Sequence, residues 1–116
     1  MSEKRVLITF NNAPFGSVHY TEGLRATVGV TSGIDEHAVD VVYLGDGVYF
    51  TLAGADRSDS QLYLGTLETL GYSLKVERES LTAHGLAESD LAPDVQVISR
   101  EEVLDLIQQA DVTIDF

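Results

Sequence analysis

The chain contains no cysteine among its 116 residues. Disulfides and thiolate metal sites are therefore excluded. The absence also excludes one kind of catalysis, because a thiolate is the only side chain that can accept a sulfur atom and pass it on. Sulfur transfer by this chain alone is not expected.

Positive charge is also scarce. The chain has seven lysines and arginines against 19 aspartates and glutamates, which gives a formal net charge of −12 and a pI near 4.3. A field of that sign repels the phosphates of nucleic acids and anionic membrane surfaces, so neither is an expected partner. Two explanations of the acidity remain open: a solvated surface, as in a salt-rich cytoplasm, or a docking face for a basic partner.

Long hydrophobic runs and low-complexity tracts are missing as well. No apolar run approaches the ~20 residues that span a bilayer, and the apolar stretch near the N-terminus is too short for the core of a signal peptide. The content of hydrophobic residues, 44%, is that of an ordered globular protein. We expect one cytoplasmic domain over residues 1–116.

Apolar runs rich in β-branched residues alternate with helical patterns along the chain. The runs predict strands at residues 4–10, 38–44, 72–76 and 95–98, and a half-exposed edge strand at 112–116. Strands separated by helices indicate a parallel sheet covered on both faces, a three-layer α/β fold. In such folds ligands bind at the carboxyl ends of the strands.

The first predicted helix begins at Ser17, which can cap it, and ends near Gly33. Its apolar positions lie on one face and are Tyr20, Leu24 and Val28. Gly23 and Gly29 weaken such a helix by about 1 kcal/mol each relative to alanine. We expect close packing against a neighbouring element at both glycines.

Three further helices are predicted. One covers residues 61–70 and ends at Gly71, and about one turn covers residues 79–84 and ends at Gly85. A capping box of Ser99 and Glu102 begins the last helix. The apolar positions expected to face inward are Tyr63, Leu67 and Leu70 in the first of these helices, and Val103, Leu106, Ile107 and Ala110 in the last.

The loop at residues 11–17 precedes a helix N-terminus, where backbone N–H groups can bind an anion. Its candidate ligand contacts are Asn11, Asn12 and Ser17. The loop lacks the glycines of a dinucleotide site and the lysine of a P-loop, so an ordinary strand–helix turn with a capping serine explains it too.

Asp46 is a further candidate contact, and it lies between two glycines at a predicted strand end. Its environment suits a ligand or subunit contact, and simple turn chemistry explains it equally well. The segment that follows is more apolar than one turn over a sheet requires. Intradomain packing and a subunit interface are both open for its residues, which are Val48, Tyr49, Phe50 and Leu52.

The three histidines show no metal-ligand spacing, and we expect neither a metal nor a cofactor. His19 could serve as a base for Ser17 or Ser80, but nothing in the sequence supplies a third catalytic member. We expect the histidines to be surface or packing residues. An acid–base enzyme that uses Asp46 and His19 is a hypothesis of a different class from the two given below.

Three loops carry short motifs that occur together in one family. The motifs are NAPFGS at residues 12–17 with EGL at 22–24, GDGVY at 45–49, and SLTAHGL at 80–86. In order and spacing they resemble the DsrF/TusC branch of the DsrE-like family over nearly the whole chain, with His84 at an arginine position of the family.

This resemblance implies a parallel five-stranded sheet of order 4-3-2-1-5 and assembly of three related subunits into a ring-like heterohexamer. Such assemblies relay sulfur during tRNA thiolation or sulfur oxidation. The relay cysteine follows the third strand of one subunit, and a cysteine in some DsrF-type chains aligns here with Glu77. A carboxylate cannot replace it, and Glu77 is expected in a solvated cluster, paired with Arg78.

Two functions follow as hypotheses. The first is a non-catalytic DsrF/TusC-like subunit of a sulfur-relay assembly, a trimer or hexamer that supports a cysteine-bearing partner. The alternative is a self-assembling DsrE-like domain that binds a small anion or nucleotide at the strand ends. Ser80 is a candidate contact in either, together with the residues of the two loops above.

Overall fold

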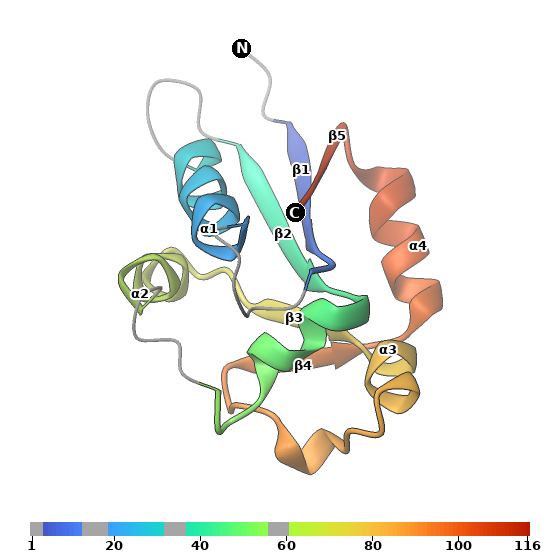
Figure 1. Ribbon diagram of the computed structural model, residues 1–116. Coiled ribbons are helices and arrows are strands. Elements are labelled where there is room, and N and C mark those ends of the chain that lie inside the picture. The colour runs from blue at the N-terminus through green and yellow to red at the C-terminus, as the bar shows by residue number, and fades with distance from the viewer. Residues whose placement is uncertain (1–3, 13–18, 32–36, 56–60) are drawn as a thin grey trace.

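The computed structural model of the chain describes residues 4–12, 19–31, 37–55 and 61–116, and only the backbone of residues 19–22. Its centre is a five-stranded parallel sheet in the order β4-β3-β2-β1-β5 (Figure 1). The predicted fold and strand order are therefore confirmed. The strands are β1 (Arg5–Phe10), β2 (Ala38–Tyr43), β3 (Leu74–Glu77), β4 (Val95–Ile98) and β5 (Val112–Asp115).

Helices cover both faces of the sheet. Helices α1 and α2 lie on one face, and α4 lies on the other (Figure 1). A 3₁₀ helix, η1, and the short helix α3 lie near the carboxyl ends of β2 and β3. The bounds are α1 (His19–Val30), η1 (Gly45–Thr51), α2 (Gln61–Thr69), α3 (Arg78–Ala83) and α4 (Arg100–Gln109), with a 3₁₀ turn at Glu88–Asp90.

Two hydrophobic cores hold these layers together. The larger lies between the sheet and α1, α2, α3 and η1, and contains Phe10, Leu24, Leu67, Leu81 and Val48. The smaller lies under α4 and consists of Leu7, Val42, Ile98 and Val103. Because the central strands are covered on both sides, β1 is buried along all but its first residue, as its continuous apolar run predicts.

Close packing explains one of the two glycines in α1. A Cβ atom on Gly23 would lie 2.3 Å from Cε1 of Phe10 and 2.9 Å from Cγ of Phe116, so only glycine fits there. The same expectation is wrong for Gly29, where a Cβ would meet no atom within 4 Å. The predicted cap Ser17 and stop Gly33 lie outside the described residues.

The buried face of helix α2 differs from the predicted one. Leu64 and Leu67 are buried, but Leu70 is 49% exposed, so its predicted inward position is wrong. The reason is that the helix already ends at Thr69, and Gly71, at φ +86°, turns the chain toward β3. Gly71 and Gly85 both adopt positive φ after a helix, as predicted.

Helix α4 begins at its predicted capping box. The backbone N–H of Glu102 donates to the Ser99 hydroxyl over 3.2 Å, and Ser99 N donates to the Glu102 carboxylate over 3.3 Å. Val103 is buried, whereas Ile107 is 42% exposed, so the inward position predicted for Ile107 is wrong. The smaller core contacts only the stripe of α4 that carries Val103, Leu106 and Ala110, and Ile107 lies beside that stripe.

The polar residues that alternate along β3 are explained by the small area of the sheet that α4 covers. β3 is an internal strand, and its Lys75 has the register of Val42 and Gln96 on the α4 side of the sheet. There Lys75 Nζ lies 3.7 Å from Asp40 Oδ1, and Arg5 Nη2 lies 3.2 Å from Asp40 Oδ2.

Within the described ranges, no helix is both long enough and apolar enough to span a membrane.

Candidate functional site

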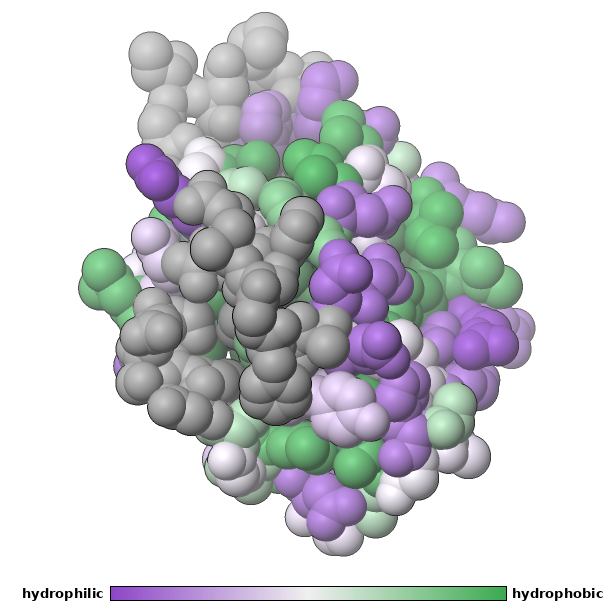
Figure 2. All heavy atoms as spheres, in the orientation of Figure 1, coloured by the Kyte–Doolittle hydropathy of each residue, from purple (hydrophilic) through white to green (hydrophobic). Residues whose placement is uncertain are grey.

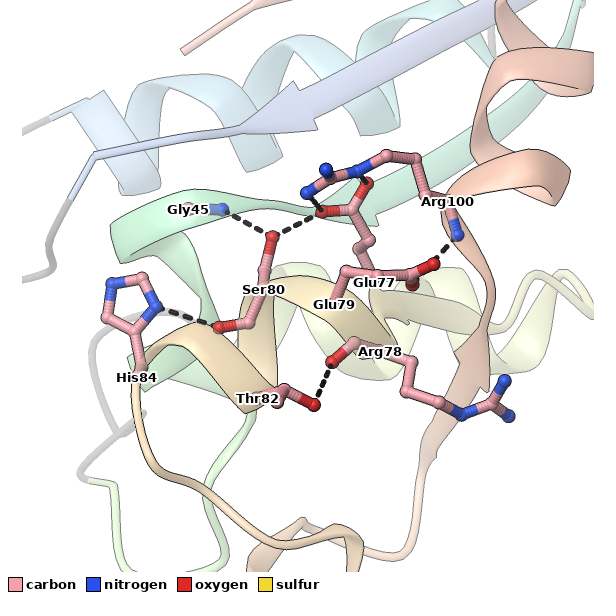
Figure 3. Close-up of polar contacts among 8 residues, drawn as sticks. All are labelled: Gly45, Glu77, Arg78, Glu79, Ser80, Thr82, His84 and Arg100. Carbon is pink, nitrogen blue, oxygen red and sulfur yellow. Dashed lines mark hydrogen bonds and ion pairs between the residues drawn. The ribbon is translucent and has the colours of Figure 1, made fainter.

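The carboxyl ends of β2, β3 and β4 converge on one group of polar residues. Gly45 follows β2, Glu77 ends β3, and Arg100 begins the helix after β4. Figure 3 shows these residues facing one another, with Ser80 of α3 between Gly45 and Glu77. Because parallel strands bring their carboxyl ends to one edge of the sheet, residues far apart in sequence meet here.

Helix η1 is held very close to the end of β1. The N–H of Leu44 donates to the Phe10 carbonyl over 3.0 Å, and a Cβ atom on Gly47 would lie 2.0 Å from that same oxygen. Such an approach leaves no room for any side chain at Gly47. The glycines around Asp46 therefore follow from backbone packing, and Asp46 itself remains mostly exposed on the rim.

Glu77 is buried in a network of hydrogen bonds, with only 5% of its surface exposed. The Ser80 hydroxyl donates to Glu77 Oε1 over 2.5 Å, and Gly45 N donates to the same hydroxyl over 3.0 Å. Arg100 adds two bonds, from Nη2 to Oε1 over 3.1 Å and from Nε to Oε2 over 3.3 Å. Every strand end in this group is thereby tied to one carboxylate.

The predicted solvated cluster at Glu77 is therefore wrong. Its partner is Arg100 rather than Arg78, because β3 and β4 pair in parallel and bring the end of β4 beside Glu77. Arg78 instead lies 3.5 Å from Glu88, and both side chains are more than half exposed. A solvated pair of that kind contributes little to stability.

The charge of Glu77 is stabilised by its neighbours. Burial alone would raise the pKa of Glu77, but the hydrogen bonds from Arg100 and Ser80 and the charge of Arg100 together outweigh burial and hold the pKa below its ordinary 4.5. The same ion pair raises the pKa of Arg100. Glu77 is therefore ionised at neutral pH.

His84 links α3 to η1 through both ring nitrogens. Nδ1 lies 2.8 Å from the Ser80 carbonyl and Nε2 lies 2.8 Å from Asp46 Oδ1. The ring also meets Tyr49 edge-on at 5.3 Å between centroids. Since both neighbours of the nitrogens accept hydrogen bonds, the doubly protonated imidazolium satisfies this geometry best. The bonds to Asp46 and to the Ser80 carbonyl raise the pKa of His84 above 6.5.

A pH dependence follows from this raised pKa. The contribution of His84 to stability is complete below its ordinary pKa of 6.5 and is lost as the pH rises through the higher pKa of the folded state. We expect the free energy of unfolding of His84→Gln to lie furthest below that of the wild type in mild acid. The gap should shrink as the pH rises above about 7.

Urea unfolding of both proteins at a series of pH values measures this gap. Asp46→Asn serves as the matched variant, because it removes the negative charge beside Nε2 and leaves an acceptor oxygen and His84 in place. Asp46→Asn should weaken the dependence of the free energy of unfolding on pH over the same range. A gap between wild type and His84→Gln that stays constant with pH would contradict the assignment.

The structure brings together only some of the candidate contacts. Asp46 and Ser80 are joined through His84. The backbone of Asn11 lies beside Gly45 and Gly47, but its hydrogen bonds go elsewhere: its N–H donates to the Phe116 carbonyl over 2.8 Å, and its side chain donates to Thr9 over 3.3 Å. Asn12 is exposed, and Ser17 lies outside the described residues.

The candidate interface residues divide into two pairs. Val48 and Phe50 are buried in the chain's own larger core, so they have no free side-chain surface to offer a second subunit. Tyr49 and Leu52 are half-buried and line an open groove of about 460 Å³. The other residues of this groove are Gly54, Ala55, Leu86 and Asp90.

Neither hydrolytic nor metal chemistry is supported by the described residues. The Ser80 hydroxyl donates to a carboxylate, and His84 contacts the carbonyl of Ser80 instead of its hydroxyl, so the two do not form a nucleophile–base pair. No group of three histidines, aspartates or glutamates in the described ranges could hold a metal ion. The side chain of His19 is outside the description.

Sequence reasoning missed the roles of Arg100 and His84. A signal for Arg100 was present, because it is a basic residue directly after a predicted strand end and so lies at the edge where ligands and partners bind. No comparable signal existed for His84. Its partner Asp46 is 38 positions away on another loop, and only the folded chain brings the two together.

Comparison with known proteins gives the same assignment as the fold. The profile of the DsrE/DsrF-like family matches residues 4–116. A protein named TusC homolog from Vibrio parahaemolyticus serotype O3:K6 is 34% identical over 113 residues, which cover 92% of this chain and 94% of that protein.

Two solved structures share the fold at lower identity. The ychN protein of E. coli has a TM-score of 0.80 at 19% identity and covers 99% of this chain and 100% of its own. MTH1491 of Methanobacterium thermoautotrophicum, a protein of unknown function, has a TM-score of 0.80 at 16% identity, with 98% and 100% covered. The sheet order, the matched profile and the identity to the TusC homolog agree, and the chain belongs to the DsrE/DsrF-like family.

Proposed function

We propose that this chain is a non-catalytic, DsrF/TusC-like subunit of a cytoplasmic sulfur-relay assembly, of the kind that serves tRNA thiolation or sulfur oxidation. Its role is to support a related subunit that carries the relay cysteine. One observation carries the proposal: where the family resemblance places a cysteine, the chain has Glu77, buried and bonded to Arg100 and Ser80.

The bonding of Glu77 supports a structural role at this position. A carboxylate can neither attack nor hold a sulfur atom. Both oxygens of the Glu77 carboxylate already accept hydrogen bonds, from Arg100 and Ser80. Removing one partner of a buried charged pair destabilises a fold. Glu77 thus holds the ends of β3 and β4 together, which keeps the surrounding surface in one shape for a partner.

The groove beside Tyr49 and Leu52 is the proposed contact with a related subunit, in a homo- or hetero-oligomer of trimeric or hexameric size. It is open, mostly apolar, and adjoins Asp46 and His84 on the rim. An apolar surface with a few polar residues at its border is typical of subunit contacts.

Charge favours this role over binding of a small anion or nucleotide at the strand ends. The guanidinium of Arg100 is already neutralised by Glu77. Glu79 and Asp46 add negative charge nearby, and the whole chain carries −12. A phosphate would meet a repulsive field there.

Co-expression with a cysteine-bearing DsrE-like chain from the same gene neighbourhood tests the proposal. Light scattering on the size-exclusion peak should give the mass of a mixed oligomer. Leu52→Glu should weaken the association by roughly tenfold or more, since it places a charge in the groove. Leu62→Glu is the matched control, because Leu62 is 78% exposed on α2 and is not among the residues that line the groove.

A wild-type chain that stays monomeric beside that partner would contradict the proposed function. Retention of the mixed oligomer by Leu52→Glu would instead move the contact away from the groove and leave the function standing.

A further inference from the structure

His84 connects the end of α3 to one wall of the groove. Its Nε2 lies 2.8 Å from Asp46 Oδ1 in η1, and its ring contacts Tyr49 edge-on at 5.3 Å between centroids. Tyr49 in turn lines the groove together with Leu52 and Leu86. In the lower part of Figure 2, where Figure 1 places η1 and the segment after α3, hydrophobic atoms are bordered by hydrophilic ones. The position of this wall therefore depends on the ring of His84.

Both nitrogens of this ring face oxygen atoms that accept hydrogen bonds. Nδ1 lies 2.8 Å from the Ser80 carbonyl (Figure 3), and Nε2 faces the Asp46 carboxylate. An imidazolium carries an N–H on each nitrogen and donates to both oxygens. A neutral imidazole carries one N–H, so its other nitrogen would present a lone pair to an acceptor. Loss of the proton therefore removes one of the two bonds.

The bond to Asp46 is the one expected to be lost. The Ser80 carbonyl is fixed in the backbone of α3, where it also accepts the backbone N–H of His84 over 3.2 Å. The side chain of Asp46 is 64% exposed, so water can replace the imidazole as its partner. A neutral His84 that keeps its proton on Nδ1 therefore retains Ser80 and releases Asp46.

The groups around the ring favour its protonated form. Asp46 faces the ring from η1, and on α3 the ring meets the carbonyl of Ser80, whose hydroxyl donates to the ionised Glu77. Asp90 lines the same groove as Tyr49 and adds a further negative charge on that side. The bonds to Asp46 and to the Ser80 carbonyl raise the pKa of His84 above 6.5, so the change of charge occurs near neutral pH.

The change is confined to one corner of η1. Val48 and Phe50 remain buried in the larger core, and Gly45 N still donates to the Ser80 hydroxyl over 3.0 Å. Tyr49 is only half-buried, and its ring rests against that of His84. Release of Asp46 therefore frees the wall of the groove without unfolding η1.

We propose that the contacts of His84 with Asp46 and Tyr49, which we call the His84 latch, make the shape of the groove depend on pH. The protonated ring holds Tyr49 in place, and loss of the proton opens the latch and changes the groove. An occupant that fits the latched groove then binds more tightly in mild acid than at alkaline pH, and by linkage it retains the proton on His84. The effect on binding rests on the proposed function, whereas the latch itself does not.

Nuclear magnetic resonance of the chain alone, with isotope-labelled histidine and tyrosine, tests the latch from about pH 6 to about pH 9. Cross-relaxation between the ring protons of His84 and Tyr49 should be present in acid and disappear as His84 titrates. The Tyr49 signal should not change over this range in His84→Gln. It should change as in the wild type in the matched control His37→Gln, because His37 accepts the N–H of Lys4 instead. A wild-type ring contact that outlasts the titration of His84 would overturn the latch, whether or not His84→Gln folds.

The affinity of the purified cysteine-bearing subunit for the same proteins tests the control of the groove. Wild type and His37→Gln should bind roughly fivefold more weakly at the alkaline end than at the acid end. His84→Gln should lose most of this difference, since ionisable groups of the partner affect all three proteins alike. An equal pH dependence in His84→Gln and wild type would overturn control of the groove and leave the proposed function intact. Failure of the wild type to bind at any pH would overturn the proposed function, while the resonance experiment would still decide on the latch.

Discussion

Replacing Gly47 with alanine is expected to lower the free energy of unfolding by about 3 kcal/mol or more. The new Cβ would lie 2.0 Å from the Phe10 carbonyl oxygen and 2.7 Å from its carbon. That carbonyl cannot simply withdraw, because it accepts the hydrogen bond of Leu44 that joins β1 to the end of β2. Relief of the clash requires η1 to move away from the sheet.

Urea unfolding followed by circular dichroism measures this loss. Gly65→Ala is the matched control, because it makes the same substitution inside α2, where a Cβ would meet nothing within 4 Å. The control should be as stable as the wild type or up to about 1 kcal/mol more stable, since alanine favours helix. Equal stability of Gly47→Ala and wild type would disprove the close approach of η1 to Phe10.

Replacing Glu77 with alanine should lower the free energy of unfolding by about 2 kcal/mol at neutral pH. The substitution removes the acceptor of the buried Ser80 hydroxyl and both bonds to Arg100. The loss is smaller than for a fully buried pair, because the Arg100 side chain is 59% exposed and water can solvate it.

The effect of Glu77→Gln should depend on pH in a predictable direction. The pKa of Glu77 is lowered from 4.5, so its charge stabilises the fold fully above that pH, and the contribution is lost as the pH falls through the lower pKa of the folded state. The gap between wild type and Glu77→Gln should therefore be largest at neutral pH and shrink in acid.

Glu88→Gln is the control for both Glu77 variants. It breaks the solvated pair with Arg78, at 3.5 Å, and should change the free energy of unfolding by less than about 0.5 kcal/mol. If the Glu77 variants were no more destabilised than Glu88→Gln, the buried network at the strand ends would not hold the fold as described.

The sheet could be predicted from the sequence because its signals are local. Apolar, β-branched runs separated by helical patterns require parallel strands, and the Ser99–Glu102 capping box marks the start of α4 at the observed residue. The strand order was available only through the family resemblance. It is now confirmed by the pairing of β1 with both β2 and β5.

Local signals do not show which side of a helix is covered. Leu70 and Ile107 have the correct spacing for a buried face, yet both are exposed, because the cover depends on where the helix ends and how wide the underlying core is.

The network at Glu77 could not be predicted for a related reason. Glu77 and Arg100 are 23 positions apart, and only the parallel pairing of β3 and β4 places them together. From sequence the same glutamate looked solvated and paired with its neighbour Arg78. The missing cysteine was therefore visible in the sequence, but the buried ion pair that replaces it was not.

The proposed function requires that this chain supports sulfur transfer without taking part in it. The most direct measurement is intact-mass spectrometry of the mixed oligomer with the cysteine-bearing subunit after treatment with a persulfide donor. We expect the partner to gain the mass of one sulfur atom, faster in the complex than alone, while this chain keeps its mass. Sulfur bound covalently to this chain, or loading of the partner at the same rate without it, would contradict the claim.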